Sequence, residues 1–432
     1  MDLFSGQDLS ATGSVVTEGV WRDLDKLTLT PNRARLVWSG IAEPGELRTG
    51  ALVQALGPQG ALRWAAEPFQ MPRYGGQPLD DPQTMGQPEE PRDRRGLARL
   101  AAIWRRVHSR LQPRLEEFDL EGELAAMESA GGRLVFPDDP AWPSSFNILE
   151  LRTPFALWVV GQLPDQNLPK VALVGARAAT AYGAAMASSL GYDCVDNGMT
   201  VISGGAYGID AAAHRGALRP ESDICPTVAV LCGGMGNPYP AGNTRLFDEI
   251  VAKGGALVTE MPPSARPARW RFLERNRLIS AWAQMVVVVE ASQRSGALAT
   301  ANRALEVGVS VGAVPGPATS PASSGTNELL KSGATVVTGV EDILFSVTGQ
   351  PGCVDQQAST LDPDLNQGLE ALSPFHRRVW DALPAKGAAS VRTVASASGL
   401  SAREVSAALA LLESQNFVKQ LAEGWERKAV FP

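Results

Sequence analysis

The fold class follows from residues 170–205, which read KVALVGARAATAYGAAMASSLGYDCVDNGMTVISGG. Lys170–Val174 and Thr200–Ser203 are short, largely apolar runs of the kind that form buried strands. Between them lie a turn and an Ala-rich segment that extends to about Asp196, which we predict to be a helix. Strands without polar alternation that are separated by a helix are typical of a parallel sheet covered on both faces. The stretch therefore predicts a strand–helix–strand unit.

The same alternation continues towards the C-terminus. Further strands are predicted at Thr227–Cys232, Ala256–Glu260, Met285–Glu290, Ser310–Val314 and Thr335–Thr338, with helical segments such as Leu298–Val307 between them. Before Lys170, residues 133–161 combine short β-type runs with proline turns. We therefore predict an α/β fold, a Rossmann-like parallel sheet covered by helices, over residues 133–348.

The regions on either side have different patterns. We expect residues 1–19, which are polar and rich in Gly and Ser, to be disordered, and residues 349–367, rich in Pro, Gly, Asp and Gln, to be a linker. Residues 20–132 show helical spacing, and two interpretations stay open: a SAM or helix-hairpin-helix-like unit, or a small helical domain that only packs. Residues 368–432 predict three helices, with Ser401 as an N-cap, and a hairpin around Gly424, which is the winged-helix order.

Composition limits the classes of function. The chain has 432 residues and a formal net charge of -7, which argues against a protein that coats DNA with basic surface. The four cysteines are scattered, so neither a disulfide framework nor a zinc site is expected. The first ten residues lack the features of a secretory signal, and no run of about 18 apolar residues predicts a membrane span. We expect a cytoplasmic protein without membrane contact.

One local segment is strongly basic. Residues 262–277 read PPSARPARWRFLERNR and carry five arginines against one acid. Cations neutralise phosphate charge, and an aromatic ring offers a stacking face to an unpaired base. If residues 268–272 are extended, the side chains of Arg269 and Arg271 lie opposite those of Trp270 and Phe272. We expect Trp270 to be a core residue and Phe272 to stack on bases, and we predict a single-stranded DNA binder.

Other anion-binding positions follow the predicted strands, because ligands of open parallel sheets sit beyond the carboxyl ends of the strands. The glycines and helix starts there present backbone N–H groups, although tight βα turns without a ligand are an equally good interpretation. Arg, Asn and Ser side chains add donors for phosphate oxygens. The candidate residues are Arg177, Ser203, Gly204, Gly205, Arg269, Phe272, Arg275, Asn276, Arg277, Arg294, Ser295 and Gly296.

Catalytic and cofactor motifs are scarce. Neither G-x-G-x-x-G nor G-x-x-x-x-G-K-[ST] occurs, and no metal-ligand spacing is present. His214 lies four positions after Asp210 on a predicted helix, where a structural or capping role is favoured. Cys232 has no nearby basic partner that would activate it as a nucleophile. We interpret Glu260 and Glu290 as partners that orient arginines, and we expect no catalytic residues, no cofactor and no metal.

Residues from about 136 to 345 closely resemble the DNA-processing protein A (DprA, also called Smf) family. The matching segments are VALVGARAATAYG, ISGGAYGIDAAAHRGAL, YPAGN, RFLERNRLIS, VVVVEASQRSGALATA, AVPGP and SGTNELL, in this order. The resemblance implies a Rossmann-like domain that binds single-stranded DNA, protects incoming strands and loads the RecA recombinase during natural transformation. It also implies a homodimer.

The resemblance further implies roles for individual residues. Phosphate contacts map to Arg177, to the turn Ser203–Gly205 and to the basic residues Arg269, Arg275, Arg277 and Arg294, and the base-stacking ring maps to Phe272. One departure is that the family's first turn, Gly-Ser-Arg, reads Gly175-Ala176-Arg177 here. One hydroxyl donor is therefore missing, and the first turn is expected to depend on Arg177 and backbone N–H groups.

Two alternatives concern other functions. The sheet also resembles that of the cytokinin-activating phosphoribohydrolases (the LOG family), but their P-G-G-x-G-T-x-x-E motif is missing and the corresponding region reads EASQRSGALATA. The second alternative concerns the winged-helix tail, whose recognition helix would have one Arg and two Glu. Since that composition attracts phosphate weakly, we favour contact with a protein, or packing, over duplex DNA.

Overall fold

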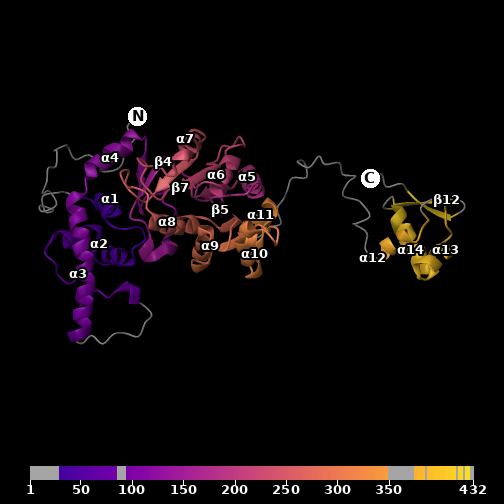
Figure 1. Cartoon of the computed structure of the whole chain (residues 1–432), viewed down its shortest axis with the longest axis horizontal. Coiled ribbons are helices and arrows are strands. Elements are labelled where there is room, and N and C mark those ends of the chain that lie inside the picture. Colours follow the sequence, from indigo (N-terminus) through magenta and orange to yellow (C-terminus); the bar gives the residue numbers. More distant parts are fainter. Residues whose placement is uncertain are drawn as a thin grey trace. The chain divides into compact units, whose positions relative to one another are not determined.

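A computed structural model of the chain describes residues 29–84, 94–348, 374–384, 387–414, 417–421 and 424–428. Contacts divide the chain into two compact units, Met1–Gly352 and Cys353–Pro432 (Figure 1). The segments predicted as a disordered start and as a linker, residues 1–19 and 349–367, lie outside the described residues. The predicted boundary at residue 132 falls within the first unit, and the division into domains stays a prediction.

The first unit is built on a nine-stranded sheet with the order β11-β10-β9-β5-β6-β7-β8-β4-β3. All the strands from β5 to β11 pair in parallel, as predicted, whereas β4 is antiparallel to both β8 and β3 at one edge. The strands are β3 (Arg133–Val135), β4 (Leu157–Gly161), β5 (Lys170–Gly175), β6 (Thr200–Ser203), β7 (Thr227–Val230), β8 (Ala256–Thr259), β9 (Met285–Glu290), β10 (Ser310–Ala313) and β11 (Thr335–Val336).

Helices cover both faces of this sheet. Successive residues of a strand point to opposite faces, so each buried strand offers apolar side chains to the helices on both faces. Val171 and Leu173 of β5 pack with helices on one face, and Ala172 and Val174 pack on the other. The first face carries α5 (Ala181–Asp196), α6 (Ile209–Ala217), α7 (Thr244–Ala252) and α11 (Val340–Thr348). The second carries the 3₁₀ helix η3 (Ser144–Arg152), α8 (Arg269–Trp282), α9 (Gly296–Glu306) and α10 (Ser324–Lys331). Short 3₁₀ turns, η4 (Ala241–Asn243) and η5 (Pro321–Ser323), precede α7 and α10.

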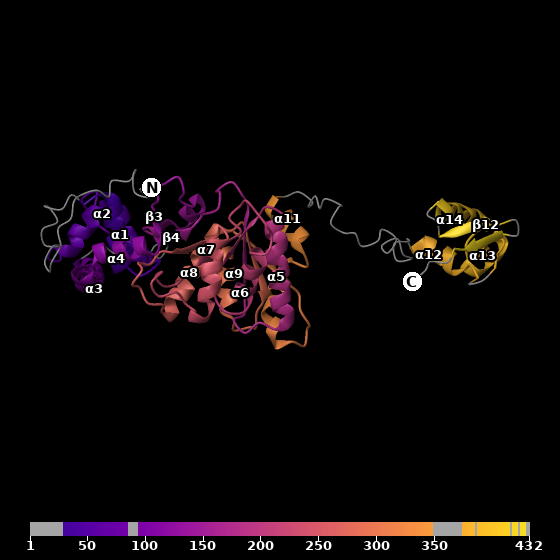
Figure 2. The ribbon, with the colours of Figure 1, turned by 90° about the horizontal axis from the view of Figure 1, so that it is seen from above.

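A helical region packs against the antiparallel edge of the sheet (Figure 2). Leu134, Phe136 and Trp158, from β3 and β4 and their ends, share a core with these helices, and the Trp158 indole donates to Ser39 Oγ over 3.2 Å. The region comprises α1 (Pro31–Ile41), α2 (Leu47–Ala66), β1 (Arg73–Tyr74), β2 (Gln77–Pro78), η2 (Pro82–Thr84), α3 (Arg94–Glu117) and α4 (Leu120–Ser129). The predicted helical pattern is present, and α2 bends at Gly57, whose φ is +70°. The helices cover a sheet edge that would otherwise expose apolar side chains.

The second unit has its own core, to which Val379, Leu409 and Trp425 contribute. Its elements are α12 (Pro374–Asp381), α13 (Val391–Ser398), α14 (Ala402–Ser414), β12 (Val418–Leu421) and β13 (Gly424–Arg427). Ser401 caps α14 as predicted, since its Oγ accepts from Glu404 N over 3.3 Å while Glu404 accepts from Ser401 N over 2.8 Å. The element order is the predicted one, and the winged-helix assignment stays a prediction. Of the helices described in either unit, none combines the length and hydropathy needed to cross a bilayer.

Candidate nucleic-acid interface

The candidate site lies where the strand order of the sheet changes direction. From β5 the chain proceeds through β6, β7 and β8 on one side, and it returns to β9, β10 and β11 on the other. The carboxyl ends of β5, β6 and β9 therefore share one edge of the sheet, and the loops that leave them diverge. These loops carry Arg177, Ser203–Gly205 and Arg294–Gly296. Such a switch point is where open α/β sheets bind ligands.

Arg177 and Phe272 meet at this edge. The Cζ atom of Arg177 lies 4.7 Å from the centroid of the Phe272 ring, although the two residues come from the β5–α5 turn and from α8. The Arg177 side chain is exposed and Phe272 is half-buried. A cation over an aromatic face is an attractive arrangement, and it places a guanidinium and a ring in one surface feature. The structure thus brings together two of the residues that the sequence predicts for phosphate and for base contact.

Tyr239 is a neighbour that the sequence reasoning did not single out. Its ring lies 5.5 Å from that of Phe272 in an edge-to-face arrangement, and the residue is 44% exposed. It lies in the YPAGN segment, which contributed to the family resemblance but contains no charge. The sequence offered one signal for Tyr239, which is an aromatic residue directly before a proline in a turn after β7.

The glycine turn after β6 is tightly packed. Ser203 is fully buried, and its hydroxyl donates to the Leu173 carbonyl oxygen over 2.6 Å, so the predicted hydroxyl donor to phosphate is already engaged within the sheet. Gly205 has a φ of +67°, and a Cβ atom there would lie 2.7 Å from the Phe247 ring. These positions satisfy the tight-turn interpretation. Gly204 differs, because a Cβ atom on it would lie 2.5 Å from Arg275 Nη2.

Arg275 lies beneath this turn as a buried cation. It is 5% exposed, and its guanidinium donates to the Gly204 carbonyl oxygen over 2.7 Å and to that of Val230. Among the described residues Arg275 forms no ion pair with a carboxylate, and its Nε has no hydrogen-bond partner. Burial lowers the pKa of Arg275 and also raises the pKa of the nearby Asp210 carboxyl. The charge beneath the turn is therefore partly offset by carbonyl dipoles and by the Asp210 carboxyl, which lies nearby without forming an ion pair.

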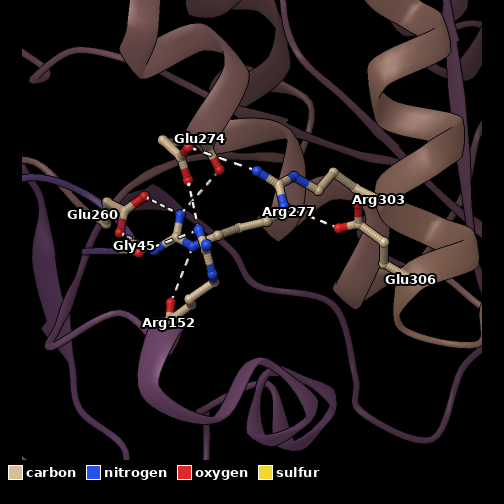
Figure 3. Close-up of polar contacts among 7 residues, drawn as sticks. All are labelled: Gly45, Arg152, Glu260, Glu274, Arg277, Arg303 and Glu306. Atoms are coloured by element: carbon tan, nitrogen blue, oxygen red, sulfur yellow. Dashed lines mark hydrogen bonds and ion pairs between the residues drawn. The ribbon is translucent and has the colours of Figure 1, made fainter. Parts of the chain in front are cut away.

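Arg277 faces a different part of the molecule from Arg275. It is 2% exposed and forms two hydrogen bonds to the Glu260 carboxylate, at 2.6 Å and 2.5 Å, and its Nε donates to the Arg152 carbonyl oxygen over 3.0 Å. Figure 3 shows this pair with the surrounding ion pairs of Glu274 with Arg152 and Arg303. The predicted phosphate contact at Arg277 does not agree with this position, because the guanidinium is enclosed and its donors are occupied.

The two glutamates predicted to orient arginines have different partners. Glu260 does orient Arg277. Glu290 instead accepts hydrogen bonds from Thr180, from its N–H over 2.8 Å and from its hydroxyl over 2.6 Å, so the arginine prediction is wrong for Glu290. The reason is local, since the start of α5 reaches the end of β9 and supplies donors to the carboxylate there. Glu290 therefore holds the β5–α5 turn that carries Arg177.

The start of α8 corrects two predictions. The extended conformation considered for residues 268–272 is wrong, because only Ala268 is extended and the helix begins at Arg269, two positions after the last proline of the segment. The core position of Trp270 is also wrong. Trp270 is 57% exposed, and its indole N–H donates to Glu43 of the α1–α2 loop over 3.1 Å. Arg271 also contacts Glu43, at 3.3 Å, whereas Arg269 is exposed.

Of the remaining predicted residues, Arg294, Ser295 and Gly296 lie at the start of α9 and Asn276 lies in the middle of α8. Ser295 caps α9, because its Oγ accepts from the Ala297 N–H over 3.3 Å. Gly296 has open space around it, and the Arg294 side chain is exposed in the same turn. Asn276 is 9% exposed, between Arg275 and Arg277 on α8. Arg294 and the start of α9 are thus accessible to an anion at the edge that carries Arg177.

Groups that could perform acid–base or nucleophilic chemistry are buried. His214 is fully buried, and its Nδ1 lies 2.7 Å from Thr227 Oγ1 rather than beside Asp210, which agrees with a structural role. Burial, assisted by the charges of Arg275 and Arg215, lowers the pKa of His214 to about 3. Burial raises the pKa of the Cys232 thiol, which disfavours the reactive thiolate. In the part of the chain that the structure describes, no group of three or more His, Cys, Asp or Glu side chains is arranged to hold a metal ion.

Comparisons with known proteins agree with this arrangement. The family of DNA recombination-mediator protein A matches residues 133–348. A candidate DNA processing protein DprA of Mycobacterium tuberculosis is 45% identical over 303 residues, which cover 67% of this chain and 76% of the relative. The chain belongs to the DNA processing protein A family. The solved DprA structure of Streptococcus pneumoniae matches with a TM-score of 0.54 at 26% identity and covers 74% of this chain and 99% of its own.

A further DprA structure, from Helicobacter pylori, concerns its mode of binding single-stranded DNA; it is 28% identical, covers 49% of this chain and 94% of its own, and has a TM-score of 0.43. Within the DprA family, the first turn of this chain departs from the usual Gly-Ser-Arg sequence. Here Ala176 fixes the turn through its backbone alone, since its N–H donates to Glu290 O over 2.7 Å and its carbonyl accepts from Ile209 N over 3.1 Å. The Arg177 turn is held without the missing hydroxyl.

Proposed function

We propose that this chain binds single-stranded DNA without sequence specificity at the Arg177–Phe272 site. The observation that carries the proposal is the exposed Arg177 guanidinium over the Phe272 ring, directly above a turn beneath which the buried Arg275 has no carboxylate partner among the described residues. A site of this kind attracts a phosphate, because both cations add to the local potential within a protein of net charge -7.

In the proposed complex, each group contacts a different part of the nucleotide. Arg177, Arg294 and the backbone N–H groups at the start of α9 contact phosphates, and Arg275 contributes charge from below while it holds the turn. Phe272, with Tyr239 beside it, offers ring surface to an unstacked base. None of these contacts reads a base edge, so the binding is independent of sequence.

The wider role is the one that the family resemblance implies. We propose that the chain, as a cytoplasmic homodimer, protects incoming single strands and helps to load the RecA recombinase during natural transformation and recombination. We assign it no catalytic role. The LOG-like alternative lacks its motif in this sequence, and His214 and Cys232 are both buried. Release of free base from a panel of nucleoside monophosphates would restore that alternative.

The decisive experiment compares Phe272→Ala and Arg177→Ala in titrations of the full chain with a fluorescent single-stranded oligonucleotide at several salt concentrations. We expect Phe272→Ala to weaken binding by about 1–3 kcal/mol, the usual contribution of base stacking. Arg177→Ala should reduce the slope of log K against log salt by about 0.7, the value for one lost phosphate contact.

Matched controls exist on surfaces away from the site. Tyr74→Ala removes an aromatic ring that is 66% exposed, and Arg215→Ala removes an exposed arginine at the opposite end of α6. Neither should change the affinity or the salt slope. Wild-type affinity and salt slope in both site variants would place the binding site elsewhere and refute the proposal.

A further inference from the structure

The helix α3 is basic on one side along its whole length. It has 24 residues and seven arginines, and its two acids are the last two residues, Glu116 and Glu117. At about 100° per residue, all seven arginines fall within an arc of about 200°. They are Arg94, Arg95, Arg99, Arg105, Arg106 and Arg110, which are exposed, and Arg114, which is half-buried.

The opposite side of α3 explains why this face points outward. The buried residues of the helix, Trp104, Val107, His108, Leu111 and Leu115, occupy an arc of about 100° and pack into the core of the helical region. The helix cannot rotate without exposing them, so the arginines are fixed on the surface. A concentration of positive charge of this size is unusual in a chain whose net charge is -7.

Two of these arginines pair with glutamates near the end of the helix, and two in its middle form no ion pair among the described residues. Arg110 pairs with Glu46, and Arg114 pairs with Glu43 over 2.9 Å. Arg105 lies over the Phe69 ring at 5.0 Å, and neither Arg105 nor Arg106 forms an ion pair among the described residues. The Arg110 side chain is 42% exposed in its pair with Glu46, so its guanidinium is accessible to a phosphate as well.

The basic face also connects to the proposed site. Glu43, which pairs with Arg114 near the end of α3, accepts hydrogen bonds from Trp270 and Arg271 at the start of α8. The exposed Arg269 begins that helix, and Phe272 lies in the same first turn. Figure 1 shows α3 as the long helix at the end of the first unit that is farthest from α11. The end of α3 and the start of α8, which carries Arg269 and Phe272, are therefore joined through their shared contact with Glu43.

From this connection we infer that the exposed arginine face of α3 is a second binding surface for the phosphate backbone of a single strand held at Phe272. The inference rests on the proposed function and extends it. The helix is about 36 Å long at 1.5 Å per residue, enough for several nucleotides beyond the central site. Its arginine face contacts backbone only, so the added affinity depends on strand length and on salt, and not on sequence.

Oligonucleotide length separates the two surfaces experimentally. The full-length Arg105→Ala/Arg106→Ala variant and the wild-type protein are titrated with oligonucleotides of about 6 and about 30 nucleotides, the shorter of which occupies only the central site. We expect unchanged affinity for the short strand. For the long strand, the slope of log K against log salt should fall by about 1.4, the sum of two lost contacts of about 0.7 each.

The matched control is Arg215→Ala/Arg219→Ala, which removes the same charge from exposed positions at the far end of α6, where Arg219 lies over a tyrosine ring as Arg105 lies over Phe69. It should bind both strands as the wild type does. The inference would be overturned if the α3 variant and the wild type bound the long strand with equal affinity and equal salt slope. A loss of binding to an acidic protein in that variant would not rescue the inference. Failure of the wild type to bind either strand would instead refute the proposed function.

Discussion

At the scale of single residues, Arg275 and Arg277 show how two neighbouring arginines of one motif differ. Both belong to the RNR sequence of α8, and both are buried. Since two positions along a helix turn a side chain by about 200°, one guanidinium lies beneath the glycine turn and the other lies against Glu260. Arg275 therefore supports the proposed site, whereas Arg277 supports the fold.

The buried Arg277–Glu260 pair predicts a large effect on stability. Arg277→Met leaves the Glu260 carboxylate, 8% exposed, without its cationic partner, and such a loss typically costs about 3–5 kcal/mol. Denaturant unfolding should show this loss. The matched variant Arg277→Met/Glu260→Leu removes both charges and should recover most of it. If the double variant is no more stable than the single one, the cost lies in packing and not in the unpaired charge.

His214 predicts how stability changes with acid. The hydroxyl of Thr227 donates its proton to the Val201 carbonyl oxygen, so Thr227 Oγ1 accepts a hydrogen bond from the protonated Nδ1 of His214. The buried Nε2 of His214 has no hydrogen-bond partner among the described residues. The pKa of His214 falls from 6.5 to about 3 on folding, because burial disfavours the charged ring. The unfolded chain therefore binds more protons than the folded chain between these values, and stability decreases as the pH falls through this window.

The measurement compares His214→Gln with the wild type by denaturant unfolding between pH 7 and pH 4. At pH 7 we expect the variant to be less stable. The difference should narrow by up to about 1.4 kcal/mol for each pH unit below about 6, since glutamine does not titrate. Parallel stability curves would show that the His214 ring is protonated in the folded state as readily as in the unfolded one.

The residue predictions also show what sequence can and cannot supply. The sequence selected Arg177 and Phe272 from a basic turn after a strand and a ring within an arginine segment, and the structure brings these two side chains together. The exposure of Trp270 could not be predicted, because it depends on Glu43, a residue 227 positions away whose carboxylate holds the indole at the surface. The buried state of Arg277 depends in the same way on Glu260 of another strand end.

At the scale of elements, two turns form the site by packing against each other. A Cβ atom on Gly208 would lie 2.2 Å from the Ala176 carbonyl oxygen and 2.5 Å from that of Arg177, so the β6–α6 turn can approach the β5–α5 turn only with glycine at this position. Gly208 also has a φ of +75°, which other residues rarely adopt. The position of Arg177 thus depends on a glycine of the neighbouring loop.

Gly208→Ala should therefore weaken binding of single-stranded DNA as well as stability. The matched control is Gly198→Ala, because Gly198 has nearly the same φ, +76°, but no atom lies within 4 Å of its added Cβ. Gly198→Ala should lose about 1 kcal/mol of stability from backbone strain. Gly208→Ala should lose more, because its Cβ also overlaps two backbone oxygens. Only Gly208→Ala should lose affinity in oligonucleotide titrations, and equal affinities in the two variants would show that Arg177 does not depend on the contact.

The elements themselves were largely predictable because their patterns are local. Each buried strand of the sheet is an apolar run, and the strands from β5 to β10 begin within a residue of their predicted positions. The start of α8 was misplaced because the alternation of Arg and aromatic residues there resembles a strand. The helix forms nonetheless, because the last proline that disfavours helix is Pro267. Glu43 then holds the first turn of the helix through its hydrogen bond with Arg271.

At the scale of the whole molecule, the two compact units predict a separation of roles. The proposed site and the basic face of α3 both lie in the first unit. A chain ending at Gly352 should fold and bind single-stranded oligonucleotides with the affinity of the full chain, within about twofold (~0.4 kcal/mol). Fluorescence titration of both proteins in parallel provides the check. A tenfold or greater loss would mean that the second unit takes part in binding.

The helical patterns before residue 130 and the strand patterns after it were predictable, but the shared core that joins them was not. Leu134 and Trp158 are apolar residues of short strands, and nothing local indicates that helices from before residue 130 cover them. The helical region and the sheet consequently share a core, which places α3 and α8 near enough for Glu43 to contact both.

The antiparallel edge also has a consequence for protein synthesis. Strand β4 pairs with β8, and Gly161 lies opposite Ala256, a residue that the ribosome adds 95 positions later. Until then the nascent chain can form the helices that cover β4 and its pairing with β3, but not its pairing with β8. Completion of the sheet therefore waits for most of the first unit to be translated, and chaperones that shield apolar segments would meet this chain during that interval.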